Sequence, residues 1–267
     1  MVSAGMLGGF LAGLLGIGGG IIYIFIFTEF IVRLYGDIGL TESDMVKMTI
    51  ANTIFTTTFA SLSGVIKHYR MDNFDIKTVL PIAIPASIAC ILVTYLLTFI
   101  TYSKTTFSIL FVILLFPLIY RMLTTKKEEK KISGIHHIKK KYFILVGIFS
   151  GSMTALSGLG GGFAIVPFLN NLFKVEIHKV VSISLGVIFC VAFSNTIFQL
   201  FFNNTINNIP YTYGSINILL SFPVIIGVLL AAPLGVMASK KLSPYTIRML
   251  FVGFCMLLII KILYNVI

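Results

Sequence analysis

The sequence predicts an all-α membrane protein made of two repeats in inverted topology, each a glycine-broken re-entrant helical hairpin followed by three transmembrane helices. Composition is the first observation: hydrophobic residues make up 57% of the 267 residues, and charged residues make up 11%. A soluble domain carries about 25% charged residues, so a water-soluble fold is excluded. The other two observations are the division of the chain into apolar stretches and a pair of glycine clusters.

Apolar stretches near the length that a bilayer-crossing helix needs, about 20 residues, fill most of the chain. They form two groups of four, separated by a charged linker at 124–141 that we expect to be a cytoplasmic tether. The first stretch of each group is too long for one crossing, since more than about 30 residues span about 50 Å against a hydrocarbon core of about 30 Å. The first repeat (1–123) holds stretches 2–35, 45–66, 76–100 and 105–123, and the second (142–267) holds 142–173, 180–202, 213–238 and 245–266.

Both long stretches are interrupted by a glycine cluster, GIGGG at 16–20 and GLGGG at 158–162, and 142 positions separate the two clusters. The same offset matches Gly5 with Gly147. An internal duplication accounts for this agreement between the halves.

The distribution of positive charge tests how the long stretches sit in the membrane. If both are hairpins that return to the side from which they entered, 16 of the 20 Lys and Arg residues fall on one side. If all eight stretches cross instead, the 20 residues divide as 12 and 8. The positive-inside rule favours the hairpins and places the linker in the cytoplasm. Each half then crosses three times, which makes the halves inverted.

The glycine clusters are the first candidate for a binding site. A helix broken inside hydrocarbon leaves N–H and C=O groups without partners, so such backbone is found where protein or a watery cavity covers it. Glycine lets an anion approach the backbone, and the N–H groups at a helix N-terminus attract it. Close helix packing is the alternative, and we prefer it for the outer Gly5, Gly9, Gly147 and Gly151. We expect substrate binding at Gly18, Gly19, Gly20, Ile21, Gly160, Gly161, Gly162 and Phe163.

Polar side chains on the stretches that follow each hairpin are the second candidate. Neutral hydroxyl and amide donors suit an anion that must be held and then released, and interhelical hydrogen bonding is the alternative role. Glu29 is the acidic residue inside an apolar stretch, and we prefer an interfacial role for it. The histidines, His68 and His178 among them, are expected to be solvated in loops. The expected substrate contacts are Asn52, Thr53, Ser184 and Asn195.

Two motifs carry a family resemblance: GLGGGFAIVP at 158–167 and AAPLG at 231–235 resemble those of the TauE/SafE sulfite-exporter family. The first repeat departs from the family in having Phe25 where Pro is usual. The resemblance implies a secondary transporter, an exporter, of sulfite, thiosulfate or organosulfonates, working by alternating access around a midplane site in a bacterial-type inner membrane. It implies a small anionic substrate and a lipid bilayer as partners, and it leaves open a coupling proton or sodium ion and a homodimer.

Other functional classes of protein are less well supported by the sequence. A membrane-embedded lipid-pyrophosphate phosphatase, which also uses re-entrant hairpins, is the alternative function, but it needs carboxylates and arginines to position phosphate or metal. The cysteines share no metal-ligand spacing, so we expect no metal, cofactor or catalytic residue. The basic residues lie beside helix ends, where membrane anchoring explains them without a nucleic acid.

Overall fold

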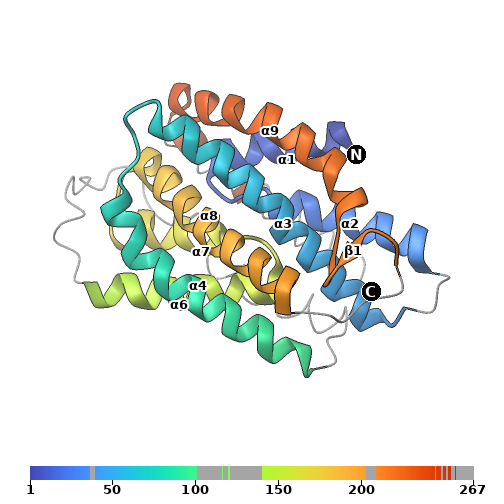
Figure 1. Cartoon of the computed structure of the whole chain (residues 1–267). Coiled ribbons are helices and arrows are strands. Elements are labelled where there is room, and N and C mark those ends of the chain that lie inside the picture. The colour runs from blue at the N-terminus through green and yellow to red at the C-terminus, as the bar shows by residue number, and fades with distance from the viewer. Residues whose placement is uncertain are drawn as a thin grey trace.

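The computed structural model describes residues 1–36, 40–100, 140–202 and 209–243, together with 116, 120 and scattered positions in 245–256 (Figure 1). The linker expected at 124–141 and the helices expected at 105–123 and 245–266 lie largely outside the described residues.

Long apolar helices dominate the described residues, and four of them are long and apolar enough to cross a membrane. They confirm the expected all-α membrane protein. The two strands of the described part, β1 (Thr212–Tyr213) and β2 (Ile216–Asn217), form a short antiparallel hairpin. The four long helices are α3 (Glu42–Tyr69), α4 (Ile76–Thr98), α8 (Ile177–Phe202) and α9 (Ile218–Lys241).

The start of α9 differs from the start expected at position 213, because the preceding residues form the β-hairpin. Gly214 has a φ of 61°, which a turn requires and a helix does not allow. The side-chain oxygen of Asn217 accepts the Leu220 N–H at 3.0 Å and so caps the first turn of the helix. The polar turn is therefore outside the membrane-crossing helix.

Both long stretches are broken at their glycine clusters, in the same way. The first consists of α1 (Val2–Leu15) and α2 (Gly20–Tyr35). Gly16 ends α1 in the left-handed region, with its N–H bonded to Ala12 O at 3.0 Å. Gly158 ends the matching helix with its N–H bonded to Thr154 O at 2.7 Å. This second stretch consists of α6 (Lys140–Ser157), α7 (Gly162–Pro167) and the π-helical turn η3 (Phe168–Leu172).

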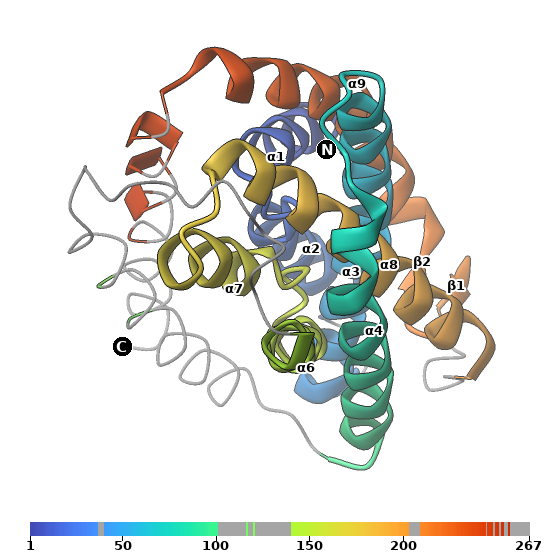
Figure 2. The same cartoon turned by 90° about the vertical axis from the view of Figure 1, so that its left-hand side faces the viewer.

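The first helix of each half packs on the last described helix of the other half. A Cβ on Gly5 of α1 would overlap Val224 O of α9, and a Cβ on Gly147 of α6 would overlap Ile82 O of α4. The offset of 142 positions that relates Gly5 to Gly147 also relates Ile82 to Val224. In both pairs the backbones approach closely because glycine has no side chain. Figures 1 and 2 show α1 beside α9, and α6 beside α4.

These contacts predict a large effect of a branched side chain at Gly151. Its Cβ would overlap the backbone of Ala86 on α4, and overpacking of this kind costs about 1–3 kcal/mol. Gly151→Val is therefore expected to lower the melting temperature and the yield of folded protein in detergent. Gly36→Ala is the matched control, because a Cβ on Gly36 meets none of the described residues within 4 Å. Equal melting temperatures for the two variants would contradict the close packing.

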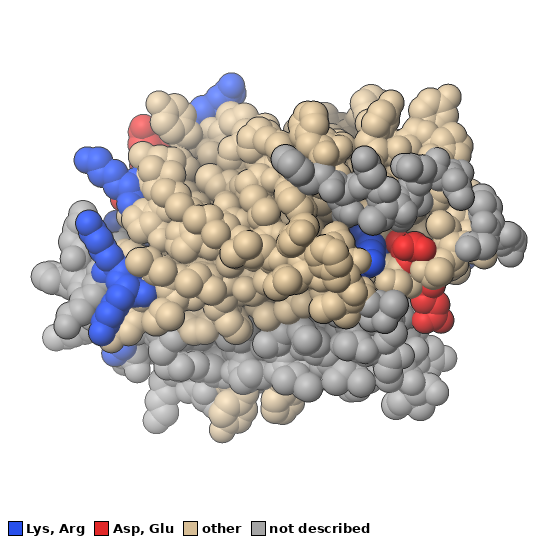
Figure 3. All heavy atoms as spheres, turned by 60° about the horizontal axis from the view of Figure 1, so that its bottom comes forward, with Lys and Arg blue, Asp and Glu red and all other residues tan. Residues whose placement is uncertain are grey.

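Charged side chains gather at opposite ends of the molecule (Figure 3). One end, which we call the basic end, holds the last turns of α3 and α9 and the first turns of α4, α6 and α8. The opposite end, which we call the acidic end, holds Glu29, Arg33, Glu42, Asp44 and Lys47. The basic end carries Lys67, Arg70, Lys77, Lys140, Lys141, Lys179, Lys240 and Lys241.

Candidate functional site

The two glycine breaks lie against each other in the interior. A Cβ on Gly20 would lie 2.8 Å from Leu159 Cα and 2.9 Å from Gly158 O. In return, a Cβ on Gly162 would lie 2.5 Å from Gly16 O and 2.8 Å from Ile17 Cα. The two breaks, which the offset of 142 positions relates in the sequence, therefore contact each other through their backbones.

The central helices α3 and α8 enclose these breaks with the same two side chains. Cβ atoms on Gly18 and Gly160 would lie 2.9 and 3.0 Å from Thr57 Cγ2, and 3.0 and 3.2 Å from Ile188 Cγ2. The Cα of Val181 lies against Gly16, and the Cα of Ile50 lies against Gly158. The offset from Ile50 to Val181 is 131 positions, and the same offset relates Thr57 to Ile188. These contacts of the two breaks with α3 and α8 are thus matched.

Backbone N–H groups without partners line the breaks. The hydrogen bonds of α2 begin with Ile22 and Tyr23, which donate to Gly19 O at 3.0 and 3.3 Å. Those of α7 begin with Ala164 and Ile165, which donate to Gly161 O at 3.0 and 3.1 Å. Buried N–H groups rarely stay unpaired, so these are the best candidates for contact with a ligand. Within the described part of the chain, no hydrogen bond is made by the N–H groups of Gly18, Gly19, Gly20, Ile21, Gly160, Gly161 or Gly162.

Two buried hydroxyls beside the first break also lack partners among the described residues. They belong to Tyr23 and Thr57. The Tyr23 oxygen would lie 2.6 Å from a Cβ on Gly19, and the methyl group of Thr57 faces both Gly18 and Gly160. A buried hydroxyl without a partner costs free energy that a bound anion can recover.

Of the four side chains that the sequence suggested, the structure brings Ser184 to the breaks. Its hydroxyl donates to Gly16 O at 2.7 Å, which fixes the carbonyl at the end of α1. Thr53 donates to Thr49 O of its own helix at 2.8 Å. Thr53 therefore takes the role of helix back-bonding that was the alternative for these residues.

Asn52 and Asn195 make hydrogen bonds between helices rather than with the breaks. The Oδ1 of Asn52 accepts the Asn217 N–H at 2.9 Å and the Ser221 hydroxyl at 2.8 Å. The Nδ2 of Asn195 donates to Thr94 Oγ1 at 2.6 Å and to Cys90 Sγ at 3.1 Å. Both side chains therefore hold neighbouring helices in register.

The hydrogen bonds of Asn52 predict that this residue stabilises the fold and does not determine which anion is transported. Asn52→Ala leaves the buried Asn217 N–H without its acceptor, which costs about 1–3 kcal/mol. We expect a lower melting temperature with an unchanged ranking of transported anions in an uptake assay. An altered ranking at normal stability would instead place Asn52 at the substrate.

The residues that sequence reasoning missed are Tyr23, Thr57 and Ile188. The signal for Thr57 and Ile188 was the second offset, 131 positions, which relates α3 to α8 and differs from the offset of the glycine clusters. The expectation of solvated loop histidines was wrong for His68, which lies in α3 and is 1% exposed. It was also wrong for His178, which is half-buried in the first turn of α8. Glu29 pairs with Arg33 at 2.6 Å on the surface of α2, in line with an interfacial role.

Comparison with known proteins agrees with the membrane helices and the glycine breaks. The model of the family described as sulfite exporter TauE/SafE matches residues 1–262. A protein of Methanocaldococcus jannaschii described as a probable membrane transporter protein is 27% identical over 252 residues, which cover 94% of this chain and 89% of that protein. No solved structure matches the chain. The family is one of membrane transporters and not of enzymes, so the phosphatase alternative is set aside. The chain belongs to the sulfite exporter TauE/SafE family.

Proposed function

We propose that the chain is a secondary transporter, and specifically an exporter, of small sulfur-containing oxyanions such as sulfite, thiosulfate or organosulfonates. The observation that carries the proposal is the meeting of two glycine breaks in the interior, where unpaired N–H groups of both breaks lie together. Such groups, with helix dipoles behind them, favour negative charge. The family is described as one of sulfite exporters, and this description is the reason for proposing a sulfur-containing substrate.

The transport cycle in this proposal rests on two inverted repeats, 1–123 and 142–267. Residue numbers rise together along the contacts of α1 with α9 and of α6 with α4, so each pair is parallel. Because α4 begins and α9 ends at the basic end, α6 starts at the basic end and α1 starts at the acidic end. The glycine-broken stretches therefore enter from opposite ends, as re-entrant hairpins of inverted repeats do. Rocking of one group of helices against the other would expose the central site to each side in turn.

The bound anion would be held by neutral donors. The proposed donors are the N–H groups of the two breaks and the hydroxyls of Tyr23 and Thr57, and Ser184 fixes the carbonyl of Gly16 beside them. Asn52, Thr53 and Asn195, which the sequence placed in contact with substrate, support the helices around it. Among the described residues, none of the side chains that contact the breaks is positively charged, so release does not require an ion pair to break.

The basic end faces the cytoplasm in this proposal, in a bacterial-type inner membrane, because positive residues remain on the cytoplasmic side. A coupling proton or sodium ion would supply the driving force for export.

Uptake into proteoliposomes tests the proposal. Purified protein is reconstituted and supplied with [35S]sulfite or [35S]thiosulfate, and unlabelled sulfonates, sulfate and carboxylates are added as competitors. We expect saturable uptake that sulfonates reduce more strongly than carboxylates, with protein-free vesicles as the control. Uptake that no sulfur oxyanion reduces, or that carboxylates reduce best, would contradict the substrate class.

A further inference from the structure

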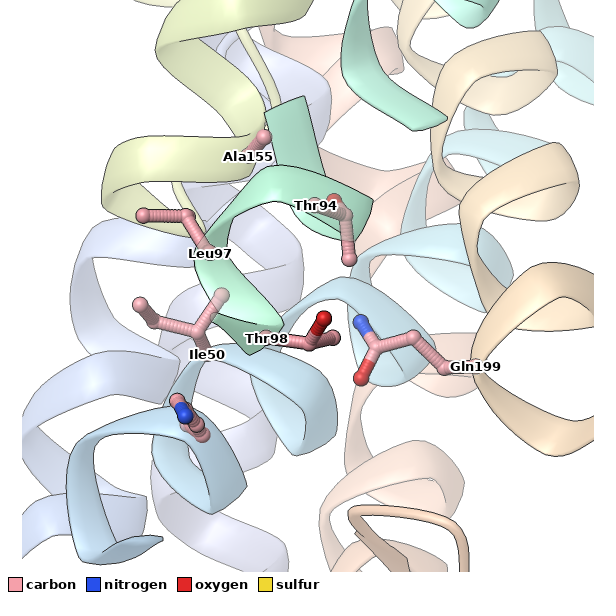
Figure 4. Close-up of a pocket in the computed structure, with 7 residues that line it drawn as sticks. Ile50, Thr94, Leu97, Thr98, Ala155 and Gln199 are labelled. Atoms are coloured by element: carbon pink, nitrogen blue, oxygen red, sulfur yellow. The ribbon is translucent and has the colours of Figure 1, made fainter. Parts of the chain in front are cut away.

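A small pocket opens to the surface between α3, α4, α6 and α8 (Figure 4). Figure 4 shows the amide of Gln199 and the hydroxyl of Thr98 turned toward each other in it. The pocket is distinct from the glycine breaks described above. Its lining residues are Lys47, Ile50, Thr94, Leu97, Thr98, Ala155 and Gln199, and we call it the Lys47 pocket.

The inner wall of the Lys47 pocket reaches the second glycine break. Ile50 lines the pocket, and its Cα lies 3.3 Å from the place of a Cβ on Gly158. Ala155 lines it too and directly follows Thr154, whose carbonyl accepts the Gly158 N–H at 2.7 Å. A ligand in the pocket is therefore separated from the central site by the backbone of one break.

The lining of the pocket is mostly apolar, and its polar side chains include those of Lys47, Thr94 and Gln199. Within the described residues Lys47 makes no ion pair, and it is half-buried in the first turns of α3. Thr94 Oγ1 accepts from Asn195 Nδ2 at 2.6 Å, which leaves its own hydrogen to donate. Gln199 Nε2 gives one hydrogen to Asn195 Oδ1 at 2.7 Å and keeps a second. Asn195 is thus a positioning residue for the donors of two helices.

We propose that the Lys47 pocket is a binding site for the transported oxyanion on the acidic side of the protein, separate from the central site. The ammonium of Lys47 attracts the anion, and Gln199 and Thr94 replace part of its hydration shell. The inference rests on the proposed function, because the anion of the pocket is the one that crosses. The inference adds charged and polar residues of α3, α4 and α8 to those that the anion meets as it crosses the protein.

The basic end of the protein has residues that match those of the Lys47 pocket. This match supports a route for the anion through the protein rather than an isolated pocket. The offset of 131 positions that relates α3 to α8 pairs Lys47 with His178 and His68 with Gln199. There the loop after α3 covers the equivalent place: Asn73 Nδ2 lies 3.3 Å from His68 Nδ1 and donates to His178 O at 3.4 Å. The place beside the break is therefore open as a pocket at one end and covered by a loop at the other end.

Kinetics of [35S]sulfite uptake in proteoliposomes test the inference. Lys47→Gln should raise KM about tenfold, equivalent to about 1.4 kcal/mol, with Vmax changed less than about twofold. Lys47→Arg keeps the charge and should keep KM within about threefold of wild type. Added salt should raise the KM of wild type more than that of Lys47→Gln, because salt screens the ammonium. Lys241→Gln, which removes an exposed charge at the basic end, is the matched control.

The outcomes separate this inference from the proposed function. If wild type transports sulfite and Lys47→Gln has the same KM and salt dependence, the pocket does not receive the anion. If the change in KM appears in phosphatidylglycerol vesicles and not in phosphatidylcholine vesicles, Lys47 acts on lipid headgroups and the inference is wrong. If wild type moves no sulfur oxyanion, the proposed function fails and the inference fails with it.

Discussion

Thr57→Val is expected to reduce sulfite uptake by at least about tenfold while the protein keeps its melting temperature. Thr57 packs its methyl group against both breaks, and its buried hydroxyl has no partner among the described residues. A hydrogen bond to a charged group is worth about 1.5–3 kcal/mol, and this would be lost from the bound anion. The methyl group that packs against Gly18 and Gly160 stays in place, because Val has the same shape. Uptake and thermal unfolding are measured on the same preparation.

The matched control for this substitution is Thr58→Val, one position along α3. The Thr58 hydroxyl donates to Ile54 O at 3.1 Å and lies 3.2 Å from Thr196 Oγ1, so it already has partners within the protein. Its loss should lower the melting temperature and leave KM unchanged. Equal uptake by Thr57→Val and wild type would show that the Thr57 hydroxyl does not bind the anion.

Gly162→Ala is expected to abolish uptake because it disturbs the contact between the two breaks. The new Cβ would lie 2.5 Å from Gly16 O and 2.8 Å from Ile17 Cα, so one break must move away from the other. Gly162 is the first residue of α7 and has no positive φ, so the effect arises from space rather than from backbone strain. Overpacking of this kind costs about 1–3 kcal/mol. Uptake and melting temperature are again measured together.

Gly20→Ala makes the reciprocal change, since its Cβ would lie 2.8 Å from Leu159 Cα. The two variants should behave alike, and Gly36→Ala, which meets none of the described residues within 4 Å, should behave as wild type. Wild-type uptake and stability in both Gly162→Ala and Gly20→Ala would show that the breaks do not touch.

The sequence predicts the helix breaks because their cause is local. A run of glycine in apolar surroundings ends a helix whatever packs around it, and the offset of 142 positions makes the second break a copy of the first. The long apolar helices follow equally from composition and length. Close packing at Gly5 and Gly147 was also predictable, since small residues recur there at helical spacing.

The partners of polar side chains depend on tertiary contacts that one sequence does not encode locally. Asn52 looked suited to an anion, but its amide bonds to Asn217 and Ser221, more than 160 positions away. Thr57 sits on the same helix, and its hydroxyl is without a partner among the described residues. Nothing in the local pattern of α3 separates the two residues, because the difference lies in what α8 and α9 place against them.

Gly19 and Gly161 are less suited than Gly20 and Gly162 to a test of substrate binding. Gly19 and Gly161 are the central glycines of each cluster, with φ values of 71° and 68°. A Cβ on Gly19 would lie 2.6 Å from Gly8 O, and one on Gly161 would lie 2.8 Å from Ser150 O. Valine at these positions therefore disturbs each hairpin itself, so loss of transport there would not distinguish binding from folding.

The most direct test of the central claim is counterflow of a sulfur oxyanion in proteoliposomes. Vesicles loaded with unlabelled sulfite are diluted into a trace of [35S]sulfite, and internal label is followed over time. A carrier with one alternating site binds labelled and unlabelled anion in turn, so we predict that label rises transiently above its equilibrium level and that the rise is lost in Gly162→Ala. Label that approaches equilibrium without an overshoot, or that never enters, would contradict a single central anion site.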